Sequence, residues 1–488
     1  MSQQAGGEQV WTMAGASLSR RALLVGSIAA MTGGFAGCTR EPEPPPVTPS
    51  SPTAAVAQFD SRFRFGLGTS AYQIEGATRA DGRGASIWDT FCAESGRIDD
   101  GSSGQVACDH YRRWESDLDL LQRLGVESYR FSIAWPRVFP NGRGSINQRG
   151  LDFYKRLVAG LHKRRIAAVA TLFHWDLPQA LQDRGGWENR DCTGWFSEYA
   201  AVLFDALEGV QTWLTINEPK IIVQQGYQLG WMAPGLQDNG AAGRAIHHLG
   251  LAHGLAVQAF RASGRAGDIG PVPVLSPVYP ADADAANQAK VSDAWENTLY
   301  LDPMFRGRYP AEIDQFDPQV VRGLEAAQRT GDLEIISAPV DLVGLNYYSP
   351  IVVDRFGQPQ VRFPTATNGW QQVHADGLYE VLVRLRTEYG AAVVITENGL
   401  PDQGDPQHDA HRIEFLQAHL LAVHRALQAG VDVRGYHAWS FLDNFEWARG
   451  YTQTWGLVHV DFETQERKPK DSAHWYAELI KGRRIAAR

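Results

Sequence analysis

Cysteine is scarce in this chain, with four in 488 residues. That number is too low for a fold held together mainly by disulfide bonds. No two cysteines have the CxxC spacing and no His/Cys cluster has the spacing of metal ligands, so we expect no structural zinc and no other metal site. Lysine and arginine form no basic stripe, and the formal net charge is −9. The charge pattern therefore argues against a nucleic-acid partner and fits a neutral substrate better.

Long hydrophobic runs are also missing. The most apolar N-terminal stretch, "SLSRRALLVGSIAAMTGGFAGC", is short and rich in glycine, which disfavours a membrane span. Its Arg20–Arg21 pair resembles a twin-arginine export signal, and "FAGC" resembles a lipoprotein box. We expect residues 1–37 to be a signal peptide and Cys38 to be lipidated, which would give a membrane contact through this anchor. The alternative is an ordinary signal cleaved nearby, with Cys38 unmodified and the protein periplasmic or secreted.

Residues 38–58 are rich in Pro, Ser and Thr and have almost no side chain large enough to pack. They predict an extended linker that holds a folded domain away from the cell envelope. Residues 59–488 have the composition of a globular domain. Cys92, Cys108 and Cys192 would remain after the linker, and a bridge between Cys92 and Cys108 is left open.

Eight short apolar runs alternate with longer helical patterns from Phe63 onward. Hydrophobic residues make up 44% of the chain and include 15 Trp, which is enough for a large core. This alternation without a break in composition predicts one (β/α)₈ TIM barrel of the α/β class, with a doubly wound sheet as the alternative. The expected strands are residues 63–71, 126–135, 167–175, 211–217, 272–279, 341–348, 392–397 and 433–441.

Polar side chains follow most of these runs. In a barrel, all carboxyl ends of the strands open on the same face, so these side chains would meet in one pocket. Two of them are carboxylates, Glu218 in "TINEP" and Glu397 in "ITENG". Each glutamate alone could simply cap the following helix. Together they are typical of glycoside hydrolysis, in which one carboxyl group donates a proton and the other attacks or activates water.

The motifs resemble those of the family 1 glycoside hydrolases, the β-glucosidase family. From about Phe63 to Tyr476 the chain contains, in order, "FGLGTSAYQIEGA", "YRFSIAWPR", "FHWDLP", "TINEP", "NYYSP", "ITENG" and "WSFLDNFEWARGY". The resemblance implies a retaining mechanism without a cofactor, with Glu397 as nucleophile and Glu218 as acid/base, their carboxyl groups about 5 to 5.5 Å apart. Arg130 and Asn346 would support them.

The resemblance also implies a set of sugar-binding residues. These are Gln73, His174, Asn217, Tyr348, Trp439, Glu446 and Trp447, with Trp439 as the stacking surface. A carboxylate at position 446 would repel phosphate, so we expect a neutral glycone: glucose first, with galactose or fucose tolerated. The expected activity is that of an exo-acting β-glucosidase on a β-glycoside or oligosaccharide.

Lys220 departs from the family pattern. Many relatives carry a flat residue at this position that stacks on the leaving group, and an ammonium group offers no such surface. An anionic leaving group is therefore one hypothesis for this chain. Two other functions stay open: a transglycosidase that uses the same carboxylates, and a surface carbohydrate-binding lipoprotein that has lost turnover.

Overall fold

The computed structural model describes residues 56–402, 404 and 407–486. The expected signal peptide, Cys38 and most of the expected linker lie outside the described residues. The folded part begins with strand β1 (Val56–Gln58), which pairs antiparallel with β14 (Arg484–Ala486) at the other end of the chain. The last three residues of the stretch we expected to be linker are therefore part of the fold.

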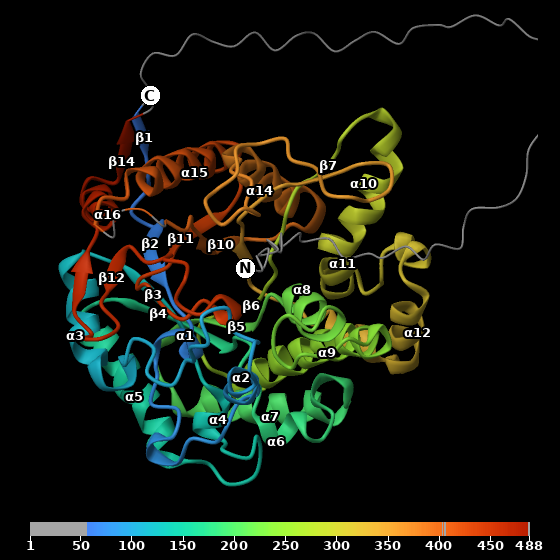
Figure 1. Ribbon diagram of the computed structural model, residues 1–488, viewed down its shortest axis with the longest axis horizontal. Helices are drawn as coiled ribbons and strands as arrows, with labels where there is room; N and C mark the ends of the chain where they lie inside the picture. Colours follow the sequence, from blue (N-terminus) through green and yellow to red (C-terminus); the bar gives the residue numbers. More distant parts are fainter. Residues whose placement is uncertain (1–55, 403, 405–406, 487–488) are drawn as a thin grey trace, which may run out of the picture.

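Eight parallel strands form the centre of the molecule (Figure 1). The neighbours in the sheet are β6, β5, β4, β3, β2, β11, β10 and β8. The two end strands are joined by backbone bonds from Asn346 N–H to Pro273 O (3.1 Å) and from Leu275 N–H to Asn346 O (3.1 Å). These bonds bring the sheet to a nearly closed barrel, so the predicted (β/α)₈ fold is confirmed and the doubly wound sheet is wrong. The strands are β2 (Arg64–Gly68), β3 (Ser128–Ser132), β4 (Ala167–Phe173), β5 (Val210–Asn217), β6 (Asp268–Val272), β8 (Val343–Asn346), β10 (Val393–Asn398) and β11 (Val433–Trp439).

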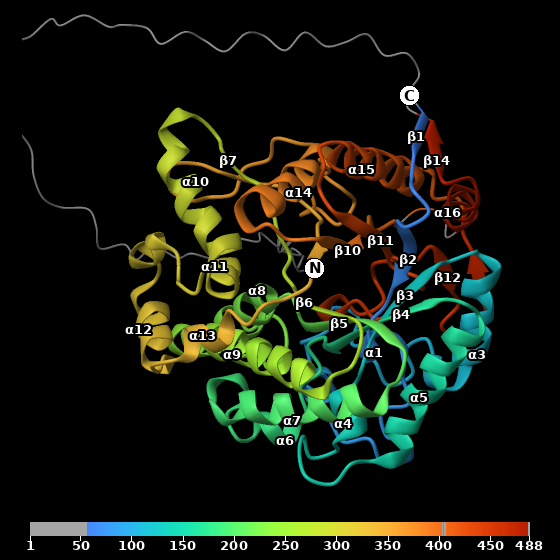
Figure 2. The same cartoon turned by 180° about the vertical axis from the view of Figure 1, so that it is seen from behind.

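Long helices surround the barrel, as Figures 1 and 2 show from opposite sides. They bury the outer faces of the strands, which explains why most strands read as continuous apolar runs. The helices around the barrel are α3 (His110–Arg123), α5 (Gln148–Lys163), α7 (Asp191–Ala206), α9 (Asn239–Ser263), α14 (Ala375–Tyr389), α15 (Ala410–Gln428) and α16 (Asp471–Gly482). Between β6 and β8, a lobe of helices lies beside the barrel: α10 (Ala286–Asp293), α11 (Leu299–Arg306), α12 (Pro318–Ala327) and α13 (Asp332–Ile336).

Shorter elements lie mainly in the loops that follow the strands. The short α-helices are α1 (Ala71–Ile74), α2 (Ile87–Ala93), α4 (Trp135–Val138), α6 (Gln179–Gln182) and α8 (Pro219–Ile221). Two π-helical segments are η3 (Ile222–Gln228) and η5 (Ala294–Thr298), and the 3₁₀ turns are η1 (Ala80–Gly82), η2 (Gly186–Glu188), η4 (Ala283–Ala285), η6 (Ala311–Gln315) and η7 (Trp447–Arg449). The remaining strands form small pairs: β7 (Val278–Pro280) with β9 (Ile351–Val353), and β12 (Val458–Val460) with β13 (Arg467–Pro469).

The fifth barrel strand was placed wrongly from the sequence. We expected residues 272–279, but the barrel strand is β6 (Asp268–Val272), and the chain then leaves the barrel to form β7. The sequence "DIGPV" reads as a turn because of Gly270 and Pro271. Gly270 is required by packing, since a Cβ atom there would lie 2.0 Å from the carbonyl oxygen of Leu342. The close contact with the neighbouring chain segment explains why a glycine interrupts the apolar run.

The three cysteines among the described residues are free. The possible Cys92–Cys108 bridge is therefore wrong. The Cys108 thiol is buried and donates to the carbonyl oxygen of Asp443 (3.1 Å). The Cys92 sulfur lies 3.6 Å from the Tyr72 hydroxyl instead. Among the helices of the described residues, none has both the length and the apolar character that a membrane crossing requires.

Candidate active site

A cavity of about 160 Å³ opens at the carboxyl ends of the barrel strands. Seven of the predicted site residues line it, and they come from five strands or the loops that follow them. These are His174, Glu218, Tyr348, Glu397, Trp439, Glu446 and Trp447. The other four predicted residues, Gln73, Arg130, Asn217 and Asn346, are fully buried and hydrogen-bond to the lining side chains. The structure therefore brings all of them into one site.

Glu397 is held by two donors on opposite oxygens. The buried guanidinium of Arg130 donates to Oε1, and the Tyr348 hydroxyl donates to Oε2 at 2.6 Å. Arg130 is itself fixed by bonds to Thr171 Oγ1 (3.2 Å) and Asn217 Oδ1 (2.6 Å). Glu397 is 3% exposed, and a carboxylate so deeply buried needs a cation and full hydrogen bonding. Arg130 and Tyr348 supply both, and they leave the carboxylate facing the cavity.

Glu218 has a different environment. It follows β5 with a left-handed backbone (φ 47°), and its N–H donates to Val272 O at 2.7 Å. Its side chain receives one neutral bond, from Asn346 Nδ2 to Oε1 at 2.6 Å. Burial and the nearby charge of Glu397 together raise the pKa of Glu218 well above its usual range. The two carboxyl groups thus differ in their surroundings: Glu397 accepts from a guanidinium and a phenol, and the surroundings of Glu218 favour the protonated form.

Glu446 lines the cavity, and Gln73 lies directly behind it. The Gln73 amide donates to Glu446 Oε2 (3.2 Å) and to Asn444 Oδ1 (2.9 Å), while its oxygen accepts from Ser70 Oγ (2.6 Å). Burial and the charge of Glu397 raise the pKa of Glu446 to about 8. A carboxyl and an amide side by side offer both donors and acceptors, which is what pairs of sugar hydroxyls require.

His174 contributes a free donor to the cavity. Asn217 Nδ2 donates to its Nε2 at 3.1 Å, so Nδ1 carries the proton. That buried Nδ1 has no hydrogen-bond partner in the described part of the chain. Burial and then the Arg130 charge lower the pKa of His174 well below its usual range, so the ring is neutral. A buried N–H without a partner at a cavity wall suits a hydroxyl group of a ligand.

Two indole rings stack around the same histidine. The rings of Trp439 and Trp447 each lie 5.9 Å from the His174 ring, nearly parallel to it. Trp175, Trp370 and Trp455 also line the cavity. Aromatic faces in such a pocket bind the C–H faces of sugar rings as well as flat apolar groups.

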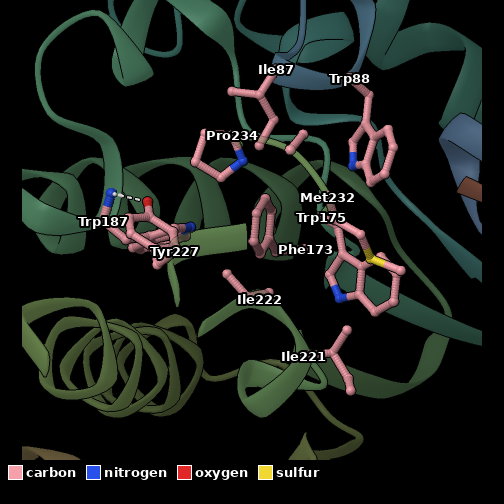
Figure 3. Close-up of a pocket in the computed structure, with 11 residues that line it drawn as sticks. Ile87, Trp88, Phe173, Trp175, Trp187, Ile221, Ile222, Tyr227, Met232 and Pro234 are labelled. Carbon is pink, nitrogen blue, oxygen red and sulfur yellow. Dashed lines mark hydrogen bonds between the residues drawn. The ribbon is translucent and has the colours of Figure 1, made fainter. Parts of the chain in front are cut away.

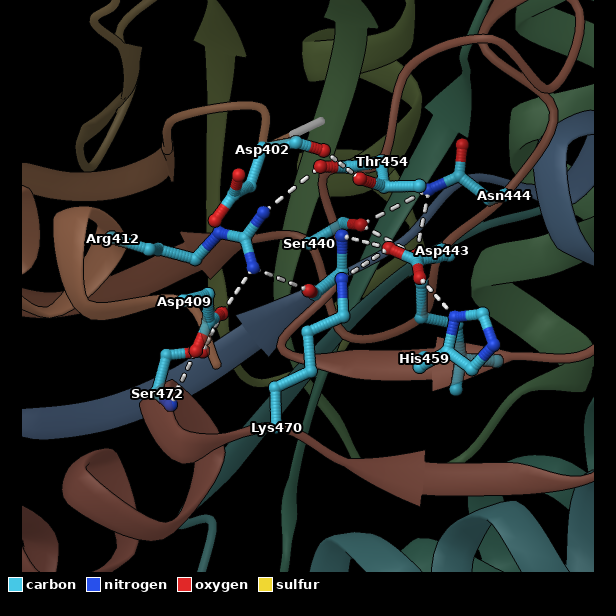
Figure 4. A network of polar contacts seen from close by, with 12 residues as sticks. Asp402, Asp409, Arg412, Ser440, Asp443, Asn444, Thr454, His459, Lys470 and Ser472 are labelled. Carbon is cyan, nitrogen blue, oxygen red and sulfur yellow. Dashed lines mark hydrogen bonds and ion pairs between the residues drawn. The ribbon is translucent and has the colours of Figure 1, made fainter. Parts of the chain in front are cut away.

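The loop after β11 is fastened by a buried polar network, shown in Figure 4. Asp443 accepts from Lys470 Nζ (2.8 Å) and Gly456 N–H (2.9 Å), and its other oxygen lies 3.1 Å from His459 Nδ1. Although burial opposes it, these donors hold the pKa of Asp443 below its usual range. Asn444, the next residue, carries the network to Gln73. The sequence did not single out Asp443 or Asn444, although both lie inside the motif "WSFLDNFEWARGY".

Lys220 does not line the cavity. Its side chain is buried, and Nζ lies 2.8 Å from Glu296 Oε2 on the π-helical segment η5. The ammonium is paired with Glu296 and does not reach the cavity, so nothing at position 220 favours an anionic leaving group, and that hypothesis loses its basis. The outer wall of the cavity is instead formed by Ile221, Trp231, Met232 and Trp370.

The wall at Trp175, Ile221 and Met232 is backed by a closely packed apolar region, shown in Figure 3. The space that remains behind it is only about 10 Å³. Gaps of that size hold at most a water-sized molecule, so the side chains have little room to move apart. The apolar side chains of this wall are therefore closely packed and have little freedom to move.

Comparison with known proteins matches the whole barrel. Residues 55–485 match the model of glycosyl hydrolase family 1. Beta-glucosidase A of Acetivibrio thermocellus is 43% identical over 442 residues, which cover 87% of this chain and 98% of that protein. Thermostable beta-glucosidase B of Thermobispora bispora is 44% identical, with 88% and 92% covered.

Solved structures agree with the sequence comparison. The family 1 β-glucosidase from Thermotoga maritima superposes with a TM-score of 0.85 at 39% identity, covering 88% of this chain and 100% of that one. The same enzyme in complex with deoxynojirimycin gives a TM-score of 0.83 at 40% identity, covering 87% and 99%. Motifs, fold and relatives agree over the same residues, and the chain belongs to glycosyl hydrolase family 1.

Proposed function

We propose that this protein is a retaining, exo-acting β-glucosidase that removes the terminal glucosyl residue from neutral β-glycosides. The observation that carries the proposal is the contrast between two buried carboxyl groups in one cavity: Glu397 is held by Arg130 and Tyr348, whereas Glu218 accepts a single amide bond. Relatives more than 40% identical carry the name beta-glucosidase, which supports the same activity.

The first step forms a glycosyl-enzyme. An oxygen of the Glu397 carboxylate attacks the anomeric carbon and forms a C–O bond to it. The bond from that carbon to the leaving oxygen breaks, and the leaving oxygen takes the proton of Glu218. Glu218 then carries the negative charge and Glu397 is a neutral ester.

The second step reverses the roles. With the charge of Glu397 gone, Glu218 is the base that removes a proton from water. The oxygen of that water bonds to the anomeric carbon, and the ester bond to Glu397 breaks. Glu397 becomes a carboxylate again and Glu218 is reprotonated. Two inversions at the same carbon release the sugar with its original β configuration.

Gln73, His174 and Glu446 would orient the sugar ring. Glu446 and His174 line the cavity beside the flat ring of Trp439, the His174 Nδ1–H has no partner among the described residues, and the Gln73 amide donates to Glu446 from behind (3.2 Å). In the described residues around this wall, Arg449 is the only lining cation, and it is paired with Asp99 (2.7 Å). This arrangement favours an unphosphorylated glycone. A phosphate group on the sugar would be repelled by Glu446, and the lining cation is already paired with Asp99.

The test is hydrolysis of 4-nitrophenyl glycosides by the chain from residue 54 onward, with Glu397→Gln as the control. We expect turnover of the β-glucoside, less of the β-galactoside and β-fucoside, and none of the α-glucoside or the 6-phosphate. The first sugar released, observed by proton NMR, should be the β-anomer. Release of the α-anomer, or an active Glu397→Gln variant, would contradict the proposed mechanism.

Cello-oligosaccharides belong in the same experiment. One relative at 41% identity carries the name 1,4-beta-D-glucan glucohydrolase, from Thermotoga neapolitana. We propose that short β-linked glucose chains are among the substrates. An exo-acting enzyme should release glucose one unit at a time from the non-reducing end, whereas release of cellobiose from the interior of a chain would exclude the exo assignment.

We also propose that the enzyme is exported and anchored at the cell envelope through Cys38. Support comes from the "RR" pair, the "FAGC" sequence and the following Pro-rich stretch. Full-length protein expressed in a bacterial host should take up a labelled fatty acid and sediment with membranes. Cys38→Ser should abolish both, and Arg20→Lys with Arg21→Lys should block export of the folded enzyme. A soluble, unlabelled wild-type protein would overturn the anchor.

A further inference from the structure

The chain has an unusual buried ion pair next to its proton donor. Lys220 lies two residues after Glu218, at the start of the helical stretch α8, and is 3% exposed. Its Nζ lies 2.8 Å from Glu296 Oε2, and Gln224 Nε2 donates to the other oxygen of Glu296 at 3.4 Å. Pro219 stands between Glu218 and Lys220, so the backbone that links the two side chains is short and stiff.

The partner of Lys220 is also tied to the cavity. Glu296 lies in η5 (Ala294–Thr298), and the next residue, Asn297, exchanges two bonds with the backbone of Ser276 (3.1 and 2.8 Å). Ser276 lines the cavity. The helical lobe beside the barrel therefore holds the ammonium in a fixed place beside the active site.

Several charged groups surround Glu218. Glu397 on β10 and Glu446 line the same cavity, and Arg130 on β3 is bound to Glu397. Tyr348 and His174 are uncharged, because burial keeps the phenol protonated and the imidazole neutral. Glu296 is the counter-charge of Lys220 on the lobe. Lys220 therefore places a buried positive charge two residues from Glu218, and this charge is paired with Glu296, whereas Arg130 is paired with Glu397.

We propose that Lys220, held by Glu296, is a positioning residue that sets how firmly Glu218 holds its proton. The proposal rests on Glu218 being the acid/base of a β-glucosidase. Glu218 has to keep a proton for the first step and give it up in the step that follows. A fixed ammonium moderates the combined effect of burial and Glu397, so that the proton is not held too tightly to be transferred.

The electrostatic sign is clear. A positive charge favours the ionised form of a neighbouring acid, and Lys220 accordingly lowers the pKa of Glu218 against the larger raising effects of burial and Glu397. Activity in the first step needs protonated Glu218 and is lost as pH rises through its pKa. Removing the ammonium must therefore move the basic limb of the pH profile to higher pH, and removing the Glu296 charge must move it to lower pH.

The experiment measures kcat/KM against pH for an unactivated β-glucoside. In Lys220→Met alone, we expect the basic limb to rise by about half a pH unit or more. In Lys220→Met with Glu296→Gln, where both charges are gone, the limb should lie between those of the two single variants. In Glu296→Gln alone, we expect it to fall. Lys220→Arg keeps the charge and should retain the wild-type limb. These opposite directions separate an electrostatic role from a merely structural one, which would lower the rate without moving the limb.

The controls separate this inference from the proposed function. If the wild type hydrolyses no β-glucoside, the proposed function is wrong. If the wild type is active with a basic limb that Glu218→Gln removes, but the limb stays in place in the folded charge variants, the role of Lys220 is wrong. Should Lys220→Met fail to fold, Glu296→Gln still gives a decisive shift, because the ammonium remains and its counter-charge is absent.

Discussion

Glu218 and Glu397 are the same kind of side chain in two opposite environments. Glu397 accepts from a guanidinium and a phenol, while Glu218 accepts from one amide and lies near the charge of Glu397. The difference arises from which neighbours the adjacent strands supply: Arg130 from β3 and Asn346 from β8. The division into nucleophile and acid follows from these neighbours and not from the glutamates themselves.

Glu218→Gln should slow substrates according to their leaving group. The amide cannot donate the proton, so an alkyl β-glucoside or cellobiose should lose on the order of 10²- to 10⁴-fold in kcat/KM. A 2,4-dinitrophenyl β-glucoside, whose leaving group needs no proton, should lose far less in its first step. Steady-state kinetics on both substrates checks this. An equal loss on the two would show that Glu218 is not the acid.

Glu446 is expected to lower the free energy of unfolding at high pH, although it helps to bind the sugar. Its pKa of about 8 in the folded state lies above the value of an unfolded glutamate, so the folded state binds more protons between the two values. The contribution of Glu446 to stability is therefore most favourable at low pH and is lost as pH rises towards 8. Glu446→Gln should raise the free energy of unfolding at pH 8 by about 1 kcal/mol or more, with little change at pH 4.5, and should raise KM.

Asp176 provides the matched control for that prediction. Its carboxyl group is fully buried, has no hydrogen-bond partner within the described residues, and burial raises its pKa to about 8. It does not line the cavity. Asp176→Asn should also be more stable at pH 8, measured by denaturant unfolding, but without a change in KM. A Glu446→Gln variant that is less stable than wild type at pH 8 would contradict the argument.

The site residues were predicted from short motifs, and these motifs were enough to identify the residues that line the cavity. They were not sufficient for the partners behind it. Asn444 bonds to Gln73 across 371 positions of the chain, and Lys220 pairs with Glu296 across 76. Nothing in the local pattern around Lys220 indicates a distant carboxylate. The sequence therefore suggested an ammonium beside the leaving group, and only the folded chain shows that it is paired with Glu296.

The loop after β11 is held in place by a buried ion pair between Asp443 and Lys470. Lys470 donates to Asp443 at 2.8 Å, and both side chains are at most 2% exposed. Lys470→Met should leave Asp443 buried with too little positive charge and destabilise the protein by about 3 kcal/mol or more. Because Asn444 would shift with Asp443, KM for the glucoside should rise as well. Chemical denaturation and kinetics measure the two effects.

Lys468→Met is the control for Lys470→Met. It lies two residues earlier and pairs with Glu466 at 3.1 Å, but its side chain is 43% exposed. An exposed pair contributes little, so the change should stay within about 0.5 kcal/mol. Similar losses for the two variants would mean that the buried network does not hold the loop.

Helices and strands were predictable to different degrees. The apolar spacing in residues 411–430 predicts a helix, and α15 (Ala410–Gln428) confirms it, with Leu416, Leu420 and Val423 buried. The same spacing predicts Ile413 and Leu427 on that buried face, but both are only partly buried, and His419 is fully buried instead. The period fixes the helix, but the centre of its buried face depends on which neighbours pack against it. The same limit explains β6, whose Gly270 is required by the backbone of Leu342, the residue just before β8.

The two ends of the folded chain meet, and this contact decides where the domain begins. β1 and β14 lie side by side in Figure 1, on the amino-terminal side of the barrel to which α16 returns the chain. The cavity lies at the opposite, carboxyl ends of the strands. The first described residue, Val56, therefore lies on the side of the barrel away from the cavity.

A chain that starts at Phe59 should be less stable than one that starts at Ala54, with the same kcat/KM. Removing Val56–Gln58 leaves β14 unpaired and exposes the buried side chain of Ile485, while the strands that carry the site are untouched. We expect Tm to drop by about 1–4 °C, which corresponds to a loss of roughly 1 kcal/mol in the free energy of unfolding. Ala57→Asp in the longer chain should reproduce the loss, because it places a charge where Ala57 is buried. Equal Tm values for the two chains would show that the terminal pair contributes nothing and that the domain begins at Phe59.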